Sequence, residues 1–301
     1  MRLLKWLYGQ PYLLLILATL FWGGNAIAGK LAVGHISPFL LTSLRWLVAS
    51  IVLVPFASRY LRDDWVLLRS RLMFLFALGA LGFAVFNNLM YSALQTTTAM
   101  NAAIIQAALP ASIFMLNFVL FRLKVTKYQL LGFPIAVLGV VAIVAQGQWR
   151  VLLELSFVLG DVLMLLAITC YGVYSVMLNK KPAVHWLSLI TVLSISALVV
   201  SLPFTVFESL SDNLILPDQT GFLVVLYTAL CASLLAQVFW IRGIDLIGSN
   251  AASLFINLVP VSGTFLAIIL LDETLHWFHV LGLAFIVGGI LLAQKAVTKL
   301  D

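Results

Sequence analysis

Ten apolar runs, each of a length that suits a membrane-spanning helix, dominate this sequence. They cover residues 12–31, 38–57, 72–93, 99–121, 129–147, 156–179, 186–206, 221–243, 249–271 and 277–295. An α-helix needs about 20 apolar residues to cross the hydrocarbon core of a bilayer. Only 9% of the residues are charged, whereas soluble domains have about 25%. The sequence therefore predicts an all-α integral membrane protein with ten transmembrane helices joined by short loops.

The second half of the sequence resembles the first at a spacing of 150 residues. Without any gap, this spacing pairs Pro110 with Pro260, Ser112 with Ser262, Leu116 with Leu266, Leu120 with Leu270, Gly132 with Gly282 and Gly139 with Gly289. Because each half has five predicted helices, an odd number, the second half enters the membrane from the opposite side. We therefore predict two inverted five-helix repeats, residues 12–147 and 156–295. Such repeats are typical of secondary transporters, and an inert duplicated bundle is the alternative.

The basic residues predict how the chain is oriented in the membrane. With the N-terminus inside, the inner loops and tails hold most of the Lys and Arg residues: Arg2, Lys5, Arg59, Arg62, Arg69, Arg71, Arg122, Lys124, Lys127, Lys180, Lys181, Arg242, Lys295 and Lys299. The outer segments carry mainly acidic residues. Because Lys and Arg are enriched on the cytoplasmic side, we expect both termini to be cytoplasmic. This asymmetry accounts for the net charge of +6 without a nucleic-acid partner.

Pro110 and Pro260 lie within apolar runs at equivalent positions of the two halves. Proline lacks an amide proton, so the carbonyls of Gln106 and Ile256 lose their helical partners. Such a gap persists in a membrane only where protein or water satisfies it, and Asn101, Gln106, Ser253 and Asn257 lie nearby. We interpret the two prolines as paired hinges beside a cavity, and a static kink is the alternative.

Further polar and aromatic residues lie at compatible depths in other predicted helices. With those near the prolines, the candidate substrate-binding residues are Trp22, Asn25, Asn87, Asn88, Tyr91, Asn101, Gln106, Tyr171, Tyr174, Gln237, Trp240 and Asn257. A binding pocket is usually apolar and aromatic, with a few placed hydrogen-bonding groups. Helix packing or an interfacial position is the alternative for each residue, and Trp240 also suits the inner aromatic belt.

Arg45 is an intramembrane charge in the second apolar run. A charge at a helix centre costs at least about 2.5 kcal/mol, so it should face the protein interior and be paired or hydrated. The sequence places no carboxylate deep in the membrane to meet it. Arg45 could therefore attract a substrate carboxylate, or it could stabilise the fold by binding helix-end carbonyls.

Catalytic and metal-binding patterns are weak in this sequence. His276 and His279 are one helical turn apart, but two histidines without further ligands do not predict a metal site. We find no paired nucleophile and base and no phosphate-binding glycine loop. An intramembrane enzyme is therefore disfavoured, and neither a metal nor a cofactor is expected.

Several motifs, taken in order, resemble the EamA family of the drug/metabolite transporter superfamily. They are Phe21-Trp22-Gly23-Gly24-Asn25 followed by Lys30, Arg45 seven residues after Pro38, and Pro260 followed by Glu273, Leu275, Gly282 and Gly289. The resemblance covers nearly the whole chain and is closest to the YddG-like amino-acid exporters. One departure is that Leu123 stands in the first half where the family pattern has the glutamate seen at Glu273.

This resemblance implies a function and a cellular location. It implies a central cavity between the helices and export of small metabolites by alternating access, with amino acids, aromatic ones included, as the first candidates. A multidrug or nucleoside exporter is the alternative. The expected location is a bacterial inner membrane, so the expected partners are a small-molecule substrate and the lipid bilayer. The oligomeric state is left open.

Overall fold

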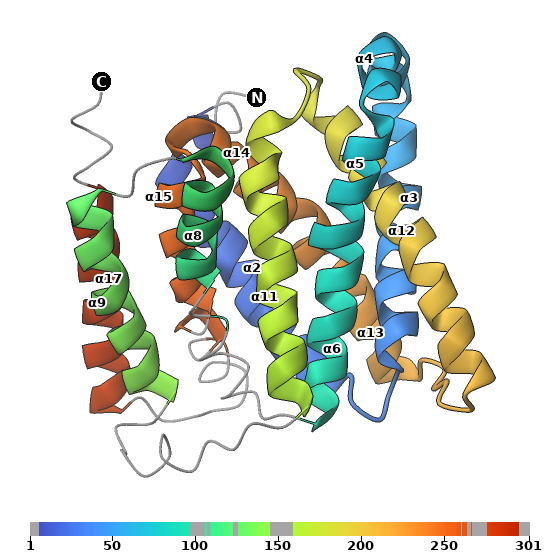
Figure 1. Cartoon of the computed structure of the whole chain (residues 1–301). Coiled ribbons are helices and arrows are strands. Elements are labelled where there is room, and N and C mark those ends of the chain that lie inside the picture. Colours follow the sequence, from blue (N-terminus) through green and yellow to red (C-terminus); the bar gives the residue numbers. More distant parts are fainter. Residues whose placement is uncertain are drawn as a thin grey trace.

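The computed structural model describes residues 6–96, 106, 109–122, 126–144, 159–259, 261–263, 266 and 276–294. Within these residues all the regular elements are helices (Figure 1). In the first half they are α2 (Pro11–Leu31), α3 (Pro38–Asp63), α4 (Trp65–Ser70), α5 (Leu72–Gly79), η1 (Ala80–Val85), α6 (Phe86–Thr96), α8 (Leu109–Phe121) and α9 (Lys127–Val144). In the second half they are α11 (Leu159–Met177), η2 (Leu178–Lys180), α12 (Trp186–Leu210), α13 (Gln219–Tyr227), η3 (Thr228–Leu235), α14 (Ala236–Ile247), α15 (Ser249–Ser253), η4 (Leu254–Asn257) and α17 (Trp277–Gln294).

Six helical spans among the described residues are long and apolar enough to cross a membrane. They are Pro11–Leu31, Pro38–Asp63, Leu72–Thr96, Val162–Lys180, Trp186–Leu210 and Gln219–Ile247. The surface is apolar, since Met73 is 88% exposed and Leu210 is 80% exposed. The interior holds polar side chains, among them Arg45, which is 1% exposed. This reversal of the soluble pattern is expected of a protein surrounded by lipid, so the chain is a multi-pass membrane protein.

The helices α3 and α12 extend further than the sequence predicted. The predicted ends at residues 57 and 206 are wrong, because the helices continue past Pro55 and Pro203 to Asp63 and Leu210. An internal proline removes one helical hydrogen bond. However, α3 and α12 pack on each other both before and after the proline of each helix, and this packing supports the continuous helices. Near one end Ser43 Oγ lies 2.7 Å from Thr205 Oγ1, and near the other Tyr60 stacks on His185 with ring centroids 3.8 Å apart.

Glycines bring α9 and α17 into backbone contact, and the two helices lie side by side in Figure 1. A Cβ atom on Gly139 would lie 2.6 Å from the carbonyl oxygen of Gly282, and one on Gly289 would lie 2.6 Å from that of Gly132. The order of these contacts makes the two helices antiparallel. Small residues permit such close approach in membranes, and these four glycines are the ones that match at the 150-residue spacing.

Two π-helical segments occupy equivalent positions in the two halves. The first, η1, interrupts the span Leu72–Thr96, and η3 interrupts the span Gln219–Ile247. Their first residues are 148 positions apart and their last residues 150 apart. Hydrophobic periodicity did not predict either segment. Short π-helical stretches occur often at functional sites, and each segment here accepts a hydrogen bond from a residue that lines the pocket described below.

The predicted hinge prolines lie at or beyond the edge of the described residues. Pro110 is the second residue of α8, but only its backbone belongs to the described part of the chain. Pro260 lies outside the described residues. The preceding chain changes from the α-helix α15 to the 3-10 helix η4, which includes Ile256. A stretch of 3-10 helix within a longer helix often marks a hinge. The hinge assignment therefore stays a prediction.

Buried polar contacts tie helices together at both ends of the bundle. At one end Glu208, 6% exposed, accepts hydrogen bonds from the backbone N–H groups of Phe39 (3.2 Å) and Leu40 (3.0 Å) at the start of α3. At the end that carries the N-terminus, Ser249 Oγ accepts hydrogen bonds from the side-chain amides of Asn117 and Asn179, both at 3.2 Å.

Outside the membrane spans, Asp218 caps the N-terminus of α13. Its carboxylate accepts a hydrogen bond from the backbone N–H of Gly221 at 2.9 Å and lies 2.7 Å from Nδ1 of His35. These two contacts, the backbone bond first, lower the pKa of Asp218. The contact between Asp218 and His35 joins the connection after α2 to the one before α13.

Candidate functional site

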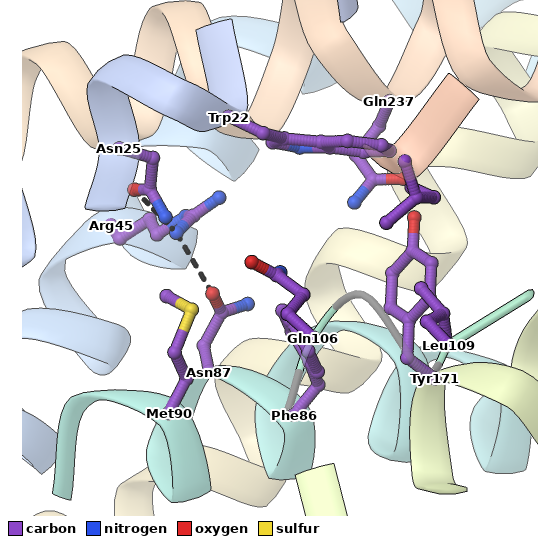
Figure 2. A pocket seen from close by; sticks show the side chains of 11 residues that line it. Trp22, Asn25, Arg45, Phe86, Asn87, Met90, Gln106, Leu109, Tyr171 and Gln237 are labelled. Carbon is purple, nitrogen blue, oxygen red and sulfur yellow. Dashed lines mark hydrogen bonds between the residues drawn. The ribbon is translucent and has the colours of Figure 1, made fainter. Parts of the chain in front are cut away.

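A pocket opens near the middle of the bundle, between helices of both halves. Its empty space, with the open mouth included, is about 450 Å³, which is an upper limit on what it encloses. Figure 2 shows its walls from close by. The lining residues are Trp22, Asn25, Arg45, Phe86, Asn87, Met90, Gln106, Leu109, Tyr171, Gln237 and Ile256.

Arg45 lies at one side of the pocket and is held by neutral oxygens. Its Nη1 donates to Oδ1 of Asn25 (3.1 Å), Oδ1 of Asn87 (2.9 Å) and the hydroxyl of Tyr91 (2.6 Å), and its Nε donates to Oγ of Ser233. No carboxylate contacts it within the described residues. The positive charge is thus hydrogen-bonded but not neutralised, and this leaves a net positive potential in the pocket.

The two π-helical segments help to position both sides of the pocket. The carbonyl of Phe83 in η1 accepts from Nε1 of Trp46 (3.3 Å) and from the side-chain amide of Asn87. The carbonyl of Ala232 in η3 accepts from Nε1 of Trp22 at 3.2 Å. These bonds fix the orientation of Asn87 beside Arg45 and of the Trp22 indole across the pocket.

Aromatic rings form much of the opposite side. Trp22 makes edge contacts with Tyr171 and with Trp240, at centroid distances of 5.9 and 5.2 Å. Tyr171 also packs on Phe86 at 4.9 Å. Contacts of this geometry stabilise aromatic pairs, so the wall is pre-organised.

Two polar atoms on the far side of the pocket make no hydrogen bond of ordinary geometry with the described residues. They are the hydroxyl of Tyr171 and Oε1 of Gln237. Each of these residues is 3% exposed. A buried polar group without a partner costs about 1 to 3 kcal/mol, so a ligand that supplied the missing hydrogen bonds would be favoured.

The structure brings most of the predicted site residues together. Trp22, Asn25, Asn87, Gln106, Tyr171 and Gln237 line the pocket together with Arg45. Three others lie behind the wall: Tyr91 hydrogen-bonds Asn25 and Arg45, Tyr174 packs on Tyr171, and Trp240 packs on Trp22. Asn88 is buried away from the lining. Asn101 and the side chain of Asn257 lie outside the described residues.

Two interpretations from the sequence need correction. Trp240 is 0% exposed, so it is part of the interior and not of an interfacial belt. Among the described residues, the partners of Arg45 are side-chain oxygens and not helix-end carbonyls, because two asparagines, a tyrosine and a serine converge on it from neighbouring helices. Sequence reasoning also missed Ser233 and the apolar lining residues Phe86, Met90, Leu109 and Ile256, which carry no distinguishing signal in so apolar a chain.

Two bacterial proteins of similar sequence are described as transporters. YetK of Bacillus subtilis (strain 168), an uncharacterized transporter, is 29% identical and aligns over 93% of this chain and 85% of its own. A probable amino-acid metabolite efflux pump of Salmonella typhimurium is 25% identical over 92% of each chain. One crystal structure shares the fold, with a TM-score of 0.75 at 19% identity, covering 97% of this chain and 98% of that one.

The family comparison matches both halves of the sequence separately. The pattern of the EamA-like transporter family matches residues 10–145 and again residues 158–294. These two matches together cover nearly the whole chain. The family and the two relatives named above are transporters and not enzymes. The chain is therefore a membrane transporter that belongs to the EamA-like transporter family.

Proposed function

We propose that this protein exports amino acids, and related small metabolites, by alternating access of the pocket that contains Arg45. The observation that carries the proposal is the positive charge of Arg45, which meets no carboxylate among the described residues and lies beside neutral acceptors and aromatic rings. A carboxylate is attracted to such a charge, and charge-assisted hydrogen bonds are roughly twice as strong as neutral ones. The efflux-pump relative supports the same cargo class. Binding would involve the lining residues, with Tyr91 and Trp240 supporting them.

The proposed architecture is ten transmembrane helices in two inverted five-helix repeats, residues 12–147 and 156–295. The antiparallel glycine contacts of α9 with α17 and the equivalent π-helical segments support this arrangement. An inverted pair of repeats can expose one site to either face of the membrane in turn. Pro110 and Pro260 are the proposed hinges for that exchange.

Other cargo classes fit the pocket less well. An organic cation would be repelled by Arg45, and no acidic residue lines the described pocket to attract it. A nucleoside has no carboxylate to bind the guanidinium. Liposomes containing the purified protein and loaded with labelled amino acids, nucleosides or cationic dyes would compare these classes directly. We expect protein-dependent release of amino acids, and release of dyes or nucleosides alone would reject the proposal.

The proposed location is a bacterial inner membrane with both termini in the cytoplasm. In Figure 1 the N-terminus and α4 lie at one end of the bundle, and the connection from α12 to α13 lies at the other. A cysteine introduced at Ser211 should therefore react with a membrane-impermeant maleimide in intact cells. One at Arg69 should react only after permeabilisation. Labelling of the Arg69 position in intact cells would reverse the assigned orientation.

A further inference from the structure

The two ends of the pocket offer different hydrogen-bonding groups. At one end Arg45 uses Nε and Nη1 for its contacts, whereas Nη2 makes no hydrogen bond with the described residues. Figure 2 shows a terminal nitrogen of Arg45 directed into the space below Trp22. The carboxamide oxygen of Gln106 lies on the same side, near Asn87. This end therefore offers a cationic donor surrounded by neutral acceptors.

The opposite end offers a hydroxyl, which can donate or accept, and a carboxamide oxygen, which accepts. In Figure 2 Tyr171 and Gln237 lie across the pocket from Arg45, and the hydroxyl of Tyr171 is directed toward the carboxamide of Gln237. Neither that hydroxyl nor Oε1 of Gln237 makes a hydrogen bond in the described part of the chain. The two residues come from different helices of the second half, since Tyr171 belongs to α11 and Gln237 to α14. Each of them is 3% exposed.

The wall between the two ends is flat and apolar. Figure 2 shows the Trp22 indole extending across the pocket from the Arg45 side to the Gln237 side. The remaining apolar contacts come from Phe86, Met90, Leu109 and Ile256. A planar aromatic body would pack well on such rings.

We infer that Tyr171 and Gln237 select amino acids whose aromatic side chain ends in a hydrogen-bond donor, namely tryptophan and tyrosine. The cargo carboxylate accepts from Nη2 of Arg45, and its ammonium donates to oxygens of Asn87 or Gln106. The ring lies along Trp22, and the indole N–H or phenol O–H donates to Gln237 or Tyr171. This inference rests on the proposed function and adds a determinant of specificity to it. A site built to bond a polar group rejects an analogue that lacks it, because its own buried groups stay unpaired.

Matched pairs of cargo test this inference. Tyrosine and phenylalanine differ by the hydroxyl, and tryptophan and 1-methyltryptophan differ by the donor N–H. In proteoliposome exchange, the wild type should prefer the donor-bearing member of each pair. Gln237→Leu and Tyr171→Phe should each lower that preference about fivefold, as the loss of one net hydrogen bond of about 1 kcal/mol implies. The control is Ser194→Ala, which removes a buried hydroxyl that has no partner among the described residues and lies outside the pocket lining. It should leave the preference unchanged.

The possible outcomes separate the inference from the proposed function. Equal exchange of both members of each pair by the wild type overturns the inference, even if neither variant folds. Unchanged preference in both folded variants overturns it as well. In each of these cases the exchange of amino acids leaves the proposed function standing. If the wild type exchanges no amino acid, the proposed function itself fails.

Discussion

Replacing Arg45 with methionine should lower amino-acid exchange about tenfold to 100-fold. A hydrogen bond to a charged group contributes about 1.5 to 3 kcal/mol, and each 1.4 kcal/mol is about a factor of ten in binding. Methionine keeps an apolar side chain of similar length but supplies neither charge nor donor. Arg45→Lys should restore only part of the activity, because one ammonium cannot reproduce the fork that reaches Ser233, Asn25 and Asn87. The measurement is the initial exchange rate per reconstituted protein.

Arg242→Met is a suitable control for that experiment. Nε of Arg242 donates to the backbone carbonyl of Tyr8 at 3.1 Å, away from the pocket lining. This variant also loses an arginine that is bonded to a neutral oxygen, yet it should exchange amino acids at nearly the wild-type rate. If Arg45→Met folds and matches it, Arg45 only stabilises the helix packing and does not bind cargo.

Leucine at Gly139 or at Gly289 should destabilise the protein by about 3 kcal/mol, near the upper end of the usual cost of overpacking. The new Cβ atom would lie 2.6 Å from a backbone carbonyl of the neighbouring helix in either variant. Because that atom belongs to a helix backbone, α9 and α17 would have to separate. The two variants should lose similar stability, since the glycines are equivalent in the two halves. Thermal unfolding of the detergent-purified protein would measure this.

Gly288 provides the matched control, because it neighbours Gly289 in α17 and a Cβ atom there would meet nothing within 4 Å. Gly288→Leu should leave the unfolding temperature unchanged or raise it slightly, as leucine favours a helix more than glycine does. Equal losses of stability at Gly288 and Gly289 would show that the glycine contact does not hold the two helices together.

Arg45 and the long apolar helices could be predicted because each differs sharply from its background. A cation within an apolar run is unusual and must be buried and bonded, and the structure confirms that it is 1% exposed and hydrogen-bonded. Six helices long and apolar enough to cross a membrane are likewise present among the described residues. Polar lining residues such as Asn25, Asn87 and Gln237 stand out in the sequence for the same reason.

Other features depend on contacts between distant segments and leave little trace in the local sequence. Residues such as Phe86 and Ile256 line the pocket but resemble the many apolar residues that face lipid. Ser233 meets Arg45 only because η3 of the second half packs against α3 of the first. The π-helical segments widen the helix without altering its hydrophobic pattern, so periodicity cannot reveal them.

Competition binding with a cargo that lacks the carboxylate tests the central claim most directly. Labelled tryptophan would be bound to the purified protein and displaced by tryptophan or by tryptophanamide, which keeps the ammonium and the indole but has no anion. Because Arg45 contacts only neutral oxygens among the described residues, we predict that the amide competes at least about tenfold more weakly with the wild type, the loss expected for one charge-assisted hydrogen bond. Equal competition by tryptophan and its amide would contradict recognition of the cargo carboxylate by Arg45.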